Sequence, residues 1–188
     1  MTTFEIHSNK TAPEAAKPFL DQAKAAYSFV PNLLGTMAEA PALLEGYMTL
    51  ASIFDKTDLT ETERQIILMT NNRLNGCTYC MAAHTSISQM AGVPADVIEA
   101  LRTNSPIADP QLEALRIFAG VVTETRGWPS DADIRAFLAA GYTRQTVLEV
   151  LLGTSLKVMS NYTNHITGTP LDEAFAPNAW TDDAEEAA

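Results

Sequence analysis

Helical periodicity runs through almost the whole sequence and constrains the fold more than any other feature. Apolar residues recur three and four positions apart in one segment after another, and no stretch shows the strict alternation that is typical of a strand. Prolines and glycines separate these segments, for example at Pro31, Pro41, Gly76, Gly92 and Gly141. The sequence therefore predicts an all-α, multi-helix bundle with no significant sheet.

Start and stop signals place the expected helices along the chain. A capping box at residues 60–63 opens a helix that ends at Asn75-Gly76, and the next helix is expected from about 77 to 91. The other expected helices cover 13–27, a short piece between Pro31 and Pro41, 42–54, 94–102, 111–125, 131–140 and about 143–166. The last of these is the longest, and because its first half is apolar nearly all round, we expect it to be buried.

The length of 188 residues fits one domain, which we expect over residues 1–176. The segment that carries the candidate chemistry lies at about 40–125, and the long C-terminal helix follows at about 143–166. Residues 177–188 are acidic and are expected to form a flexible tail.

The charge balance is acidic, with 12 Lys and Arg against 23 Asp and Glu and a formal net charge of -11. Nucleic acids and anionic membranes both favour a basic surface, so neither is an expected partner. No apolar run reaches membrane-spanning length, and the N-terminus lacks the basic flank and apolar stretch of a signal peptide. We therefore expect a cytoplasmic protein.

The two cysteines of the chain, Cys77 and Cys80, lie three residues apart, and His84 follows four residues later. On one helix these three side chains share a face. A helix N-terminus favours the thiolate, which is the reactive form of cysteine. The pattern predicts a dithiol redox site in which Cys77 is the more exposed sulfur, Cys80 lies deeper, and His84 serves Cys80 as a base.

The cysteine pair has three other interpretations. A structural disulfide is disfavoured, because it would close a very small loop in a compartment that is expected to be reducing. A Cys₂His₂ zinc site would use Cys77, Cys80, His84 and His165, but ligands in a column on one helix suit zinc poorly. A non-enzymatic redox-sensing or interaction protein, in which the pair only reports oxidation, stays open.

Two segments around the pair resemble a known family. Residues 59–68 (LTETERQIIL) and 74–84 (LNGCTYCMAAH) closely resemble the alkylhydroperoxidase D-like branch of the carboxymuconolactone decarboxylase superfamily. Residues 29–34, 40–44 and 161–165 are similar to the longer, peroxidase-related members of that branch. The decarboxylase branch works without the two cysteines, so a lactone decarboxylase is disfavoured.

The resemblance implies an all-α fold, assembly into trimers or hexamers, and a peroxiredoxin-type enzyme that reduces hydroperoxides. By the family pattern Cys80 attacks the peroxide to give a sulfenic acid, Cys77 resolves it to a disulfide, and His84 belongs to the proton relay that activates Cys80. A dithiol enzyme of this kind requires no metal and no bound cofactor. Electrons then have to return from an external dithiol, such as a lipoyl or thioredoxin-like protein.

One position departs from the family pattern. The relay normally includes a glutamate twelve residues before the first cysteine, and this chain has Gln65 there. An amide can orient His84 through a hydrogen bond but cannot carry a proton or a charge. We therefore expect weaker peroxidase turnover than in relatives with the glutamate, and a faster Gln65→Glu variant.

Three further residues are candidates for the substrate site, namely Tyr79, Tyr162 and His165. Tyr162 and His165 lie three apart on the long C-terminal helix, beside two asparagines. Such a polar cluster on a buried helix needs hydrogen-bond partners. It either lines the site near Cys80 or forms a packing network or a subunit contact.

Overall fold

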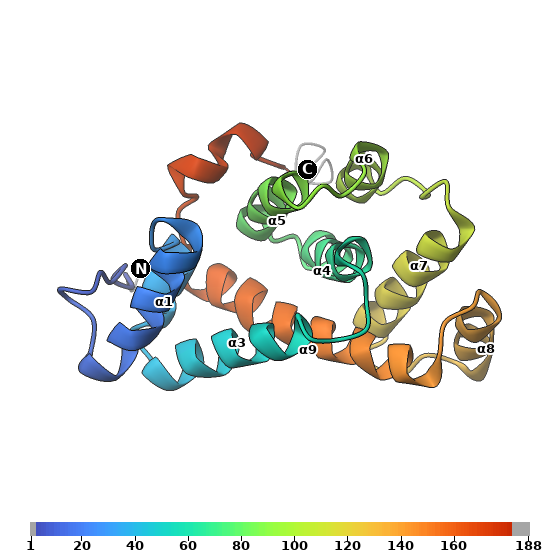
Figure 1. The fold of residues 1–188 in the computed structure, drawn as a ribbon, viewed down its shortest axis with the longest axis horizontal. Helices are drawn as coiled ribbons and strands as arrows, with labels where there is room; N and C mark the ends of the chain where they lie inside the picture. The colour runs from blue at the N-terminus through green and yellow to red at the C-terminus, as the bar shows by residue number, and fades with distance from the viewer. Residues whose placement is uncertain (1–2, 182–188) are drawn as a thin grey trace.

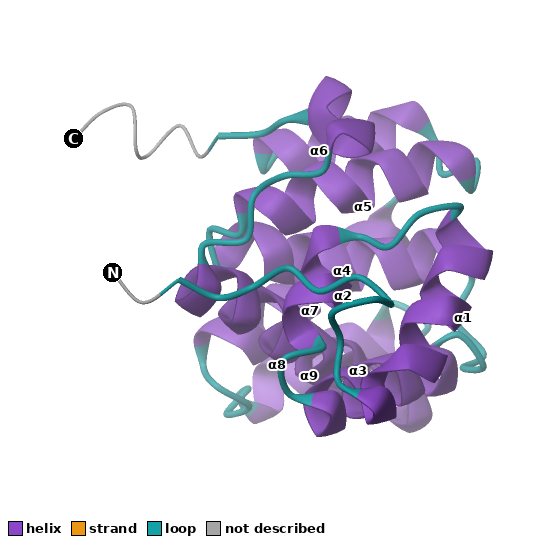
Figure 2. Cartoon of the chain, turned by 90° about the vertical axis from the view of Figure 1, so that its left-hand side faces the viewer, coloured by secondary structure: helices purple, strands orange, loops and turns teal. Residues whose placement is uncertain are grey.

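The computed structural model describes residues 3–181, and within this range the chain is all-α, with no strand (Figures 1 and 2). The helices are η1 (Glu14–Ala16), α1 (Lys17–Tyr27), α2 (Asn32–Met37), α3 (Pro41–Phe54), α4 (Glu61–Leu74), α5 (Thr78–Met90), α6 (Ala95–Thr103), α7 (Pro110–Glu124), α8 (Asp131–Ala139), α9 (Arg144–Thr167) and η2 (Glu173–Asn178). The predicted fold class is confirmed. None of the helices in the described range is long and apolar enough to cross a membrane.

Helix α4 lies at the centre of the bundle, with α5, α6, α7 and α9 packed around it (Figure 1). Its N-terminus carries the predicted capping box, in which the Thr60 backbone N–H donates to Glu63 Oε2 at 2.8 Å. The helix ends before Gly76, whose φ of 63° lies in the left-handed region that favours glycine. Because neighbours cover α4 on most sides, Ile66 and Met69 are both fully buried.

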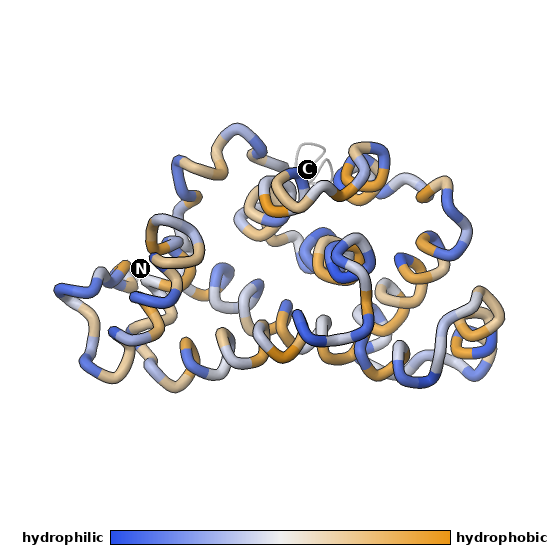
Figure 3. The backbone as a smooth tube through the Cα atoms, viewed as in Figure 1, coloured by the Kyte–Doolittle hydropathy of each residue, from blue (hydrophilic) through white to orange (hydrophobic). Residues whose placement is uncertain are grey.

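The core consists of two hydrophobic clusters. The larger one surrounds α4, α6 and α7 and includes the stacked rings of Phe118 and Phe137, whose centroids are 4.3 Å apart. The smaller one joins η1, α1, α2 and the start of α3 to the start of α5, and it contains both cysteines. Blue and orange segments alternate along the helices in Figure 3, as expected of helices that bury one side.

The first part of the predicted flexible tail is packed against the bundle, so that part of the prediction is wrong. Helix η2 extends to Asn178, and the indole N–H of Trp180 donates to the backbone oxygen of Arg102 at 3.1 Å. The guanidinium of Arg73 lies 5.3 Å from the Trp180 ring centre. An aromatic ring buries enough apolar area to hold an otherwise polar segment in place. Residues 182–188 of the tail lie outside the described range.

Candidate active site

Both cysteines are buried free thiols at the N-terminus of α5. Cys77 is the N-cap residue and Cys80 lies in the first turn, and each is 1% exposed. The expectation that Cys77 is the more exposed sulfur is therefore wrong. The physical reason is α9, since the side-chain amide of Asn164 packs over both sulfurs, with Nδ2 3.7 Å from Cys77 Sγ and 3.2 Å from Cys80 Sγ.

Asparagines hold the turn that carries the cysteines. The backbone N–H of Cys77 donates to the backbone oxygen of Asn72 at 2.9 Å, and the side chain of Asn72 donates to the backbone oxygen of Cys80 at 3.2 Å. Asn161 on α9 donates in turn to Asn72 Oδ1 at 3.0 Å. Buried amides with all their partners in place make a rigid network. These bonds join helices α4, α5 and α9 around the turn that carries the cysteines.

The two sulfurs titrate very differently. Burial alone would raise the pKa of Cys80, but a hydrogen bond from Cys77, the ammonium of Lys157 and hydrogen bonds from Asn161 and Ser160 lower it below that of a free thiol. The pKa of Cys77 is raised above that of a free thiol by its hydrogen bond to Cys80 and by burial. Of the two thiols, Cys80 is therefore the one that ionises more readily, and the Cys77 thiol is its hydrogen-bond donor.

The structure brings His84 and Gln65 together. His84 Nδ1 lies 2.9 Å from Gln65 Oε1, while Gln65 Nε2 donates to Glu61 Oε1 at 2.8 Å. Because the amide N–H group of Gln65 faces the carboxylate, its oxygen faces the ring, and so His84 carries its proton on Nδ1. The carboxyl group of Glu61 accepts this bond as an anion: partial burial would raise its pKa, but hydrogen bonds from Gln65 and Arg64 lower it.

The other ring nitrogen, His84 Nε2, lies 3.0 Å from the Nζ atom of Lys157 on α9. Burial and the nearby ammonium of Lys157 both lower the pKa of His84 well below its ordinary value, so the ring is neutral. Among the contacts of the described residues, there is no hydrogen bond between His84 and Cys80. The structure therefore does not bring the expected base to the thiol.

Lys157 is the residue of the site that the sequence analysis missed. It is 1% exposed, and it shares one face of α9 with Ser160, Asn161 and Asn164. The sequence did carry a signal, because these four polar residues follow one another at positions i, i+3, i+4 and i+7 in a largely apolar helix. That spacing marks a polar stripe directed toward the interior.

A small cavity of about 60 Å³ opens at Cys80. Its wall is mainly aromatic and aliphatic, and its lining residues are Tyr27, Pro31, Leu33, Leu34, Tyr47, Tyr79, Cys80, Ala83, His84, Ile87, Lys157 and Phe175. The candidate Tyr79 is thus part of this wall. The hydroxyl of Tyr79 is already engaged within the protein. It donates to Asp172 Oδ2 at 2.6 Å and accepts from the Leu33 backbone N–H at 3.3 Å.

The candidates Tyr162 and His165 do not line the cavity at Cys80, and their role in a substrate site stays a prediction. Tyr162 is 50% exposed, His165 is exposed as well, and their rings stack on each other at 6.4 Å on the outer side of α9. Each residue of a helix is turned by about 100° from the one before it, so neighbours of the inward-facing Asn161 and Asn164 face outward. The packing or contact alternative for these two residues stays open.

The position of His165 also removes the proposed fourth zinc ligand. It lies on the outer side of α9, whereas Cys77, Cys80 and His84 lie beneath its inner side. Within residues 3–181, no group of three or more His, Cys, Asp or Glu side chains is arranged to hold a metal ion. The Cys₂His₂ grouping is therefore not assembled.

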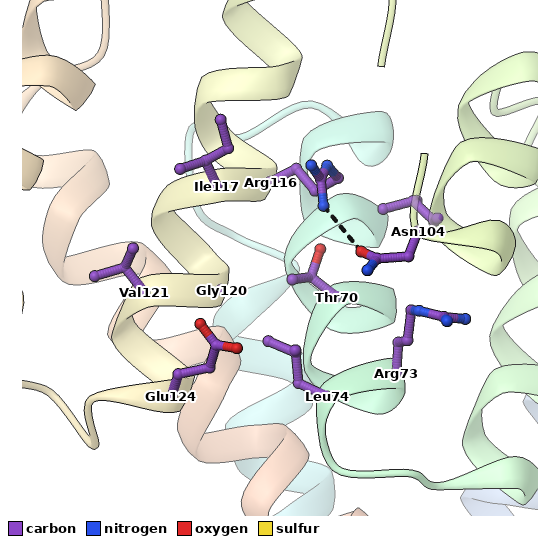
Figure 4. A pocket seen from close by; sticks show the side chains of 10 residues that line it. Thr70, Arg73, Leu74, Asn104, Arg116, Ile117, Gly120, Val121 and Glu124 are labelled. Carbon is purple, nitrogen blue, oxygen red and sulfur yellow. Dashed lines mark hydrogen bonds between the residues drawn. The ribbon is translucent and has the colours of Figure 1, made fainter. Parts of the chain in front are cut away.

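A second hollow of about 230 Å³ lies away from the cysteines, between α4 and α7 (Figure 4). Arg116 Nη1 donates to Asn104 Oδ1 at 3.2 Å across it, and the same guanidinium is paired with Glu113. It holds neither sulfur nor histidine among its lining residues. Of these two hollows, only the smaller one is lined by a cysteine and a histidine.

Comparison with known proteins gives a family for the central part of the chain. Residues 38–120 match the model of the Carboxymuconolactone decarboxylase family. The range includes both cysteines, Gln65 and His84. No curated protein matches the chain in sequence.

Solved structures match over nearly the full length. An uncharacterized peroxidase-related protein with an alkylhydroperoxidase AhpD core from Ralstonia eutropha JMP134 has a TM-score of 0.81 at 21% identity, covering 92% of this chain and 93% of its own. A peroxidase-related protein from Silicibacter sp. TM1040 has a TM-score of 0.77 at 19% identity, covering 93% and 92%. The debrominase Bmp8, solved as a cysteine-to-alanine variant with 2,3,4-tribromopyrrole, has a TM-score of 0.79 at 16% identity, covering 95% and 96%.

These matches show that the chain shares the all-α fold of AhpD-like proteins. The chain itself carries a Cys-x-x-Cys pair at residues 77–80. Residues 38–120 are therefore similar to the carboxymuconolactone decarboxylase family, the superfamily that the motif resembles.

Proposed function

We propose that the protein is a thiol-dependent peroxidase that reduces hydroperoxides through Cys80 and Cys77. The observation that supports this most strongly is the pairing of the more readily ionised Cys80 with a hydrogen-bonded Cys77 thiol at the end of a small cavity. The thiolate attacks the terminal oxygen of ROOH and forms a sulfenic acid, and the O–O bond breaks. Cys77 then attacks the sulfenic sulfur, releasing water and forming the disulfide, so two electrons pass from the dithiol to the peroxide.

The size of the cavity favours a small substrate. Sites for drug-sized ligands measure roughly 300–1,000 Å³, whereas the space at Cys80 is about 60 Å³. The hydroperoxide group and a small substituent fit such a space, while a bulky organic group requires the wall to move. We therefore propose hydrogen peroxide and small alkyl hydroperoxides as the preferred substrates.

The enzyme needs an external reductant to complete its cycle. The chain has only the two cysteines, so no third thiol relays electrons. A lipoyl or thioredoxin-like dithiol is our proposed donor, because thiol–disulfide exchange with it restores both thiols of the pair.

Thiol titration with stoichiometric oxidant tests this function. One equivalent of hydrogen peroxide is expected to consume both thiols of the reduced protein and to give an intramolecular disulfide. Cumene hydroperoxide, which is bulkier, is expected to react more slowly. Loss of one thiol only, or no loss on the time scale of free cysteine, would contradict the proposal and would favour a redox-sensing role.

Reductive debromination is a second candidate, because Bmp8 has a similar fold and its structure holds 2,3,4-tribromopyrrole. A dithiol can supply the two electrons for such a reaction, with a carbon–hydrogen bond and bromide as products. The small cavity argues against a tribrominated ring in this chain. Incubation of the reduced protein with 2,3,4-tribromopyrrole is therefore expected to release no bromide.

We also propose that the protein forms homo-oligomers, trimers or hexamers, through the outer side of α9. Leu148 and Ile166 are 66% and 72% exposed there, and Leu151, Val158 and Tyr162 lie between them. Apolar side chains at three- and four-residue spacing on an exposed helix favour contact with another protein surface. Leu151→Glu is expected to lower the mass measured by analytical ultracentrifugation, and a wild-type protein that sediments as a monomer would contradict the proposal.

A further inference from the structure

Lys157 is a buried ammonium group on α9, and within residues 3–181 it has no carboxylate partner. It is 1% exposed, and its Nζ atom lies 3.0 Å from the neutral ring nitrogen of His84. Among the described residues, no Asp or Glu lies within ion-pair distance of it. A buried cation is unfavourable unless an anion compensates its charge. Cys80 lines the same cavity as Lys157, and its sulfur is the group there that can carry the compensating negative charge.

The contacts of His84 argue against its role as the base for Cys80. Its Nδ1 proton goes to Gln65, which is held by Glu61, and its Nε2 lone pair faces the Lys157 ammonium. Both ring nitrogens are therefore engaged, and neither is directed at the sulfur. His84 instead fixes the position of Lys157 as a neutral hydrogen-bond acceptor.

We propose that Lys157, held by His84, keeps Cys80 ionised and donates the proton that the leaving oxygen takes. The proton donation rests on the peroxidase function proposed above, whereas the ionisation of Cys80 by Lys157 does not depend on it. In the reaction, the Cys80 thiolate takes the terminal oxygen of ROOH as a sulfenic acid, and the other oxygen leaves as RO⁻ and takes a proton from the Lys157 ammonium to give ROH.

The proton balance closes over one cycle. After the first step Lys157 is a neutral amine, and the Cys77 thiol then condenses with the Cys80 sulfenic acid to give the disulfide and water. A dithiol donor returns two electrons and two protons, of which one restores the Cys77 thiol and the other restores the Lys157 ammonium beside the Cys80 thiolate. Besides the peroxide and the donor, no further co-reactant is needed.

The remaining titratable groups that face the cavity do not compete for this role. Tyr27 from α1, Tyr47 from α3 and Tyr79 from α5 each have a raised pKa, chiefly because of burial, and are neutral at physiological pH. The Cys77 thiol is protonated, and the carboxylate of Glu61 on α4 is separated from the sulfur by Gln65 and His84. Lys157 is thus the cation of this cavity.

The test measures the pKa of the Cys80 thiol directly, without peroxide, in a Cys77→Ser background where Cys80 is the single thiol. The ultraviolet absorbance of the thiolate is followed against pH. Lys157→Met is expected to raise this pKa by about 1–3 units, the usual effect of one close opposite charge. His84→Gln removes the imidazole but provides an amide oxygen that can accept from Lys157 in the place of Nε2. The pKa of Cys80 in this variant is therefore expected to stay near that of the Cys77→Ser parent.

The controls separate charge from folding. Lys56→Met removes an exposed lysine and is expected to leave the pKa of Cys80 unchanged, whereas Lys157→Arg, which keeps the charge, is expected to restore part of the shift. An unchanged pKa in Lys157→Met, or a rise in His84→Gln as large as that in Lys157→Met, would overturn the proposal. If the pKa values behave as expected but peroxide does not oxidise the parent protein, the peroxidase function fails and the thiolate assignment stands.

Discussion

The side-chain amide of Asn164 contacts both sulfur atoms directly. Its amide nitrogen lies 3.2 Å from Cys80 Sγ, and its Oδ1 atom is buried without a hydrogen-bond partner. Hydrogen bonds to the charged form of a group lower its pKa. Asn164→Leu, which keeps the shape but removes the donor, is therefore expected to raise the pKa of Cys80 by about one unit, as measured by pH-dependent alkylation.

The control for this variant lies two residues away on α9. Tyr162→Leu changes the outer side of the helix, and we expect it to leave the pKa of Cys80 as it is. Equal effects of the two substitutions would mean that Asn164 acts through the stability of α9 and not through the sulfur.

A Gln65→Glu variant distinguishes the proton relay that the family pattern implies from the role proposed for Lys157. Its Nε2 donates to Glu61 at 2.8 Å, so Gln65→Glu places two carboxyl groups at about that distance and adds a negative charge beside His84. An adjacent carboxylate raises the pKa of a histidine. We expect the protonated ring to repel Lys157 and to slow the oxidation of Cys80 at neutral pH.

Nuclear magnetic resonance titration of His84 checks the first part of this prediction, and the rate of thiol oxidation checks the second. Gln65→Met is the uncharged control, in which His84 is expected to stay neutral. A Gln65→Glu protein that is faster than wild type would support the relay of the family pattern instead.

The residues of the site that are local in sequence could be predicted, while the distant ones could not. Cys77, Cys80 and His84 occupy one short segment, so their spacing alone indicates a shared face. Lys157 is 73 residues from His84, and its contact with the ring depends on how α9 is rotated against α5. Rotation is set by packing across the bundle, which no local pattern records.

Gly153 allows helix α9 to pack closely against α3 and α4. A Cβ atom there would lie 2.8 Å from Ile67 Cγ2 and 2.9 Å from Phe54 Cζ, on α4 and α3 respectively. Overpacking a close contact typically costs about 1–3 kcal/mol. Gly153→Ala is therefore expected to lower the free energy of unfolding by about that amount, measured by chemical denaturation.

Gly120 on α7 provides the matched control. A Cβ atom there meets only ordinary contacts, the nearest being Leu74 Cδ1 at 3.7 Å. Since alanine favours a helix over glycine by up to about 1 kcal/mol, Gly120→Ala is expected to stabilise the protein. Destabilisation by both variants to the same extent would contradict the close approach at Gly153.

The helices themselves could be predicted from the sequence to within a few residues, because their end signals are local. The capping box at Thr60 and the left-handed Gly76 bound α4 as expected. The packed start of the C-terminal segment could not be predicted, since it depends on where Trp180 meets the distant Arg102. An acidic composition near a chain end does not reveal such a contact.

At the scale of the whole molecule, the smaller hydrophobic cluster covers the dithiol. Both cysteines are buried in it beside the N-terminal helices and Phe175 from η2. Access to the sulfurs is therefore expected to depend on reagent size. A small methylthiolating reagent should modify the native protein faster than an aromatic disulfide reagent, and the difference should disappear in denaturant. Equal native rates for the two reagents would mean that the sulfurs are open to solvent.

The position of the first oxidised sulfur shows which of the two cysteines is the nucleophile. Cys77→Ser and Cys80→Ser proteins are treated with one equivalent of hydrogen peroxide in the presence of a sulfenic-acid trap and are analysed by mass spectrometry. We predict the trapped adduct on Cys80 in the Cys77→Ser protein and little or none on Cys77 in the Cys80→Ser protein. An adduct that forms on Cys77 alone would contradict the assignment of Cys80 as the thiolate nucleophile.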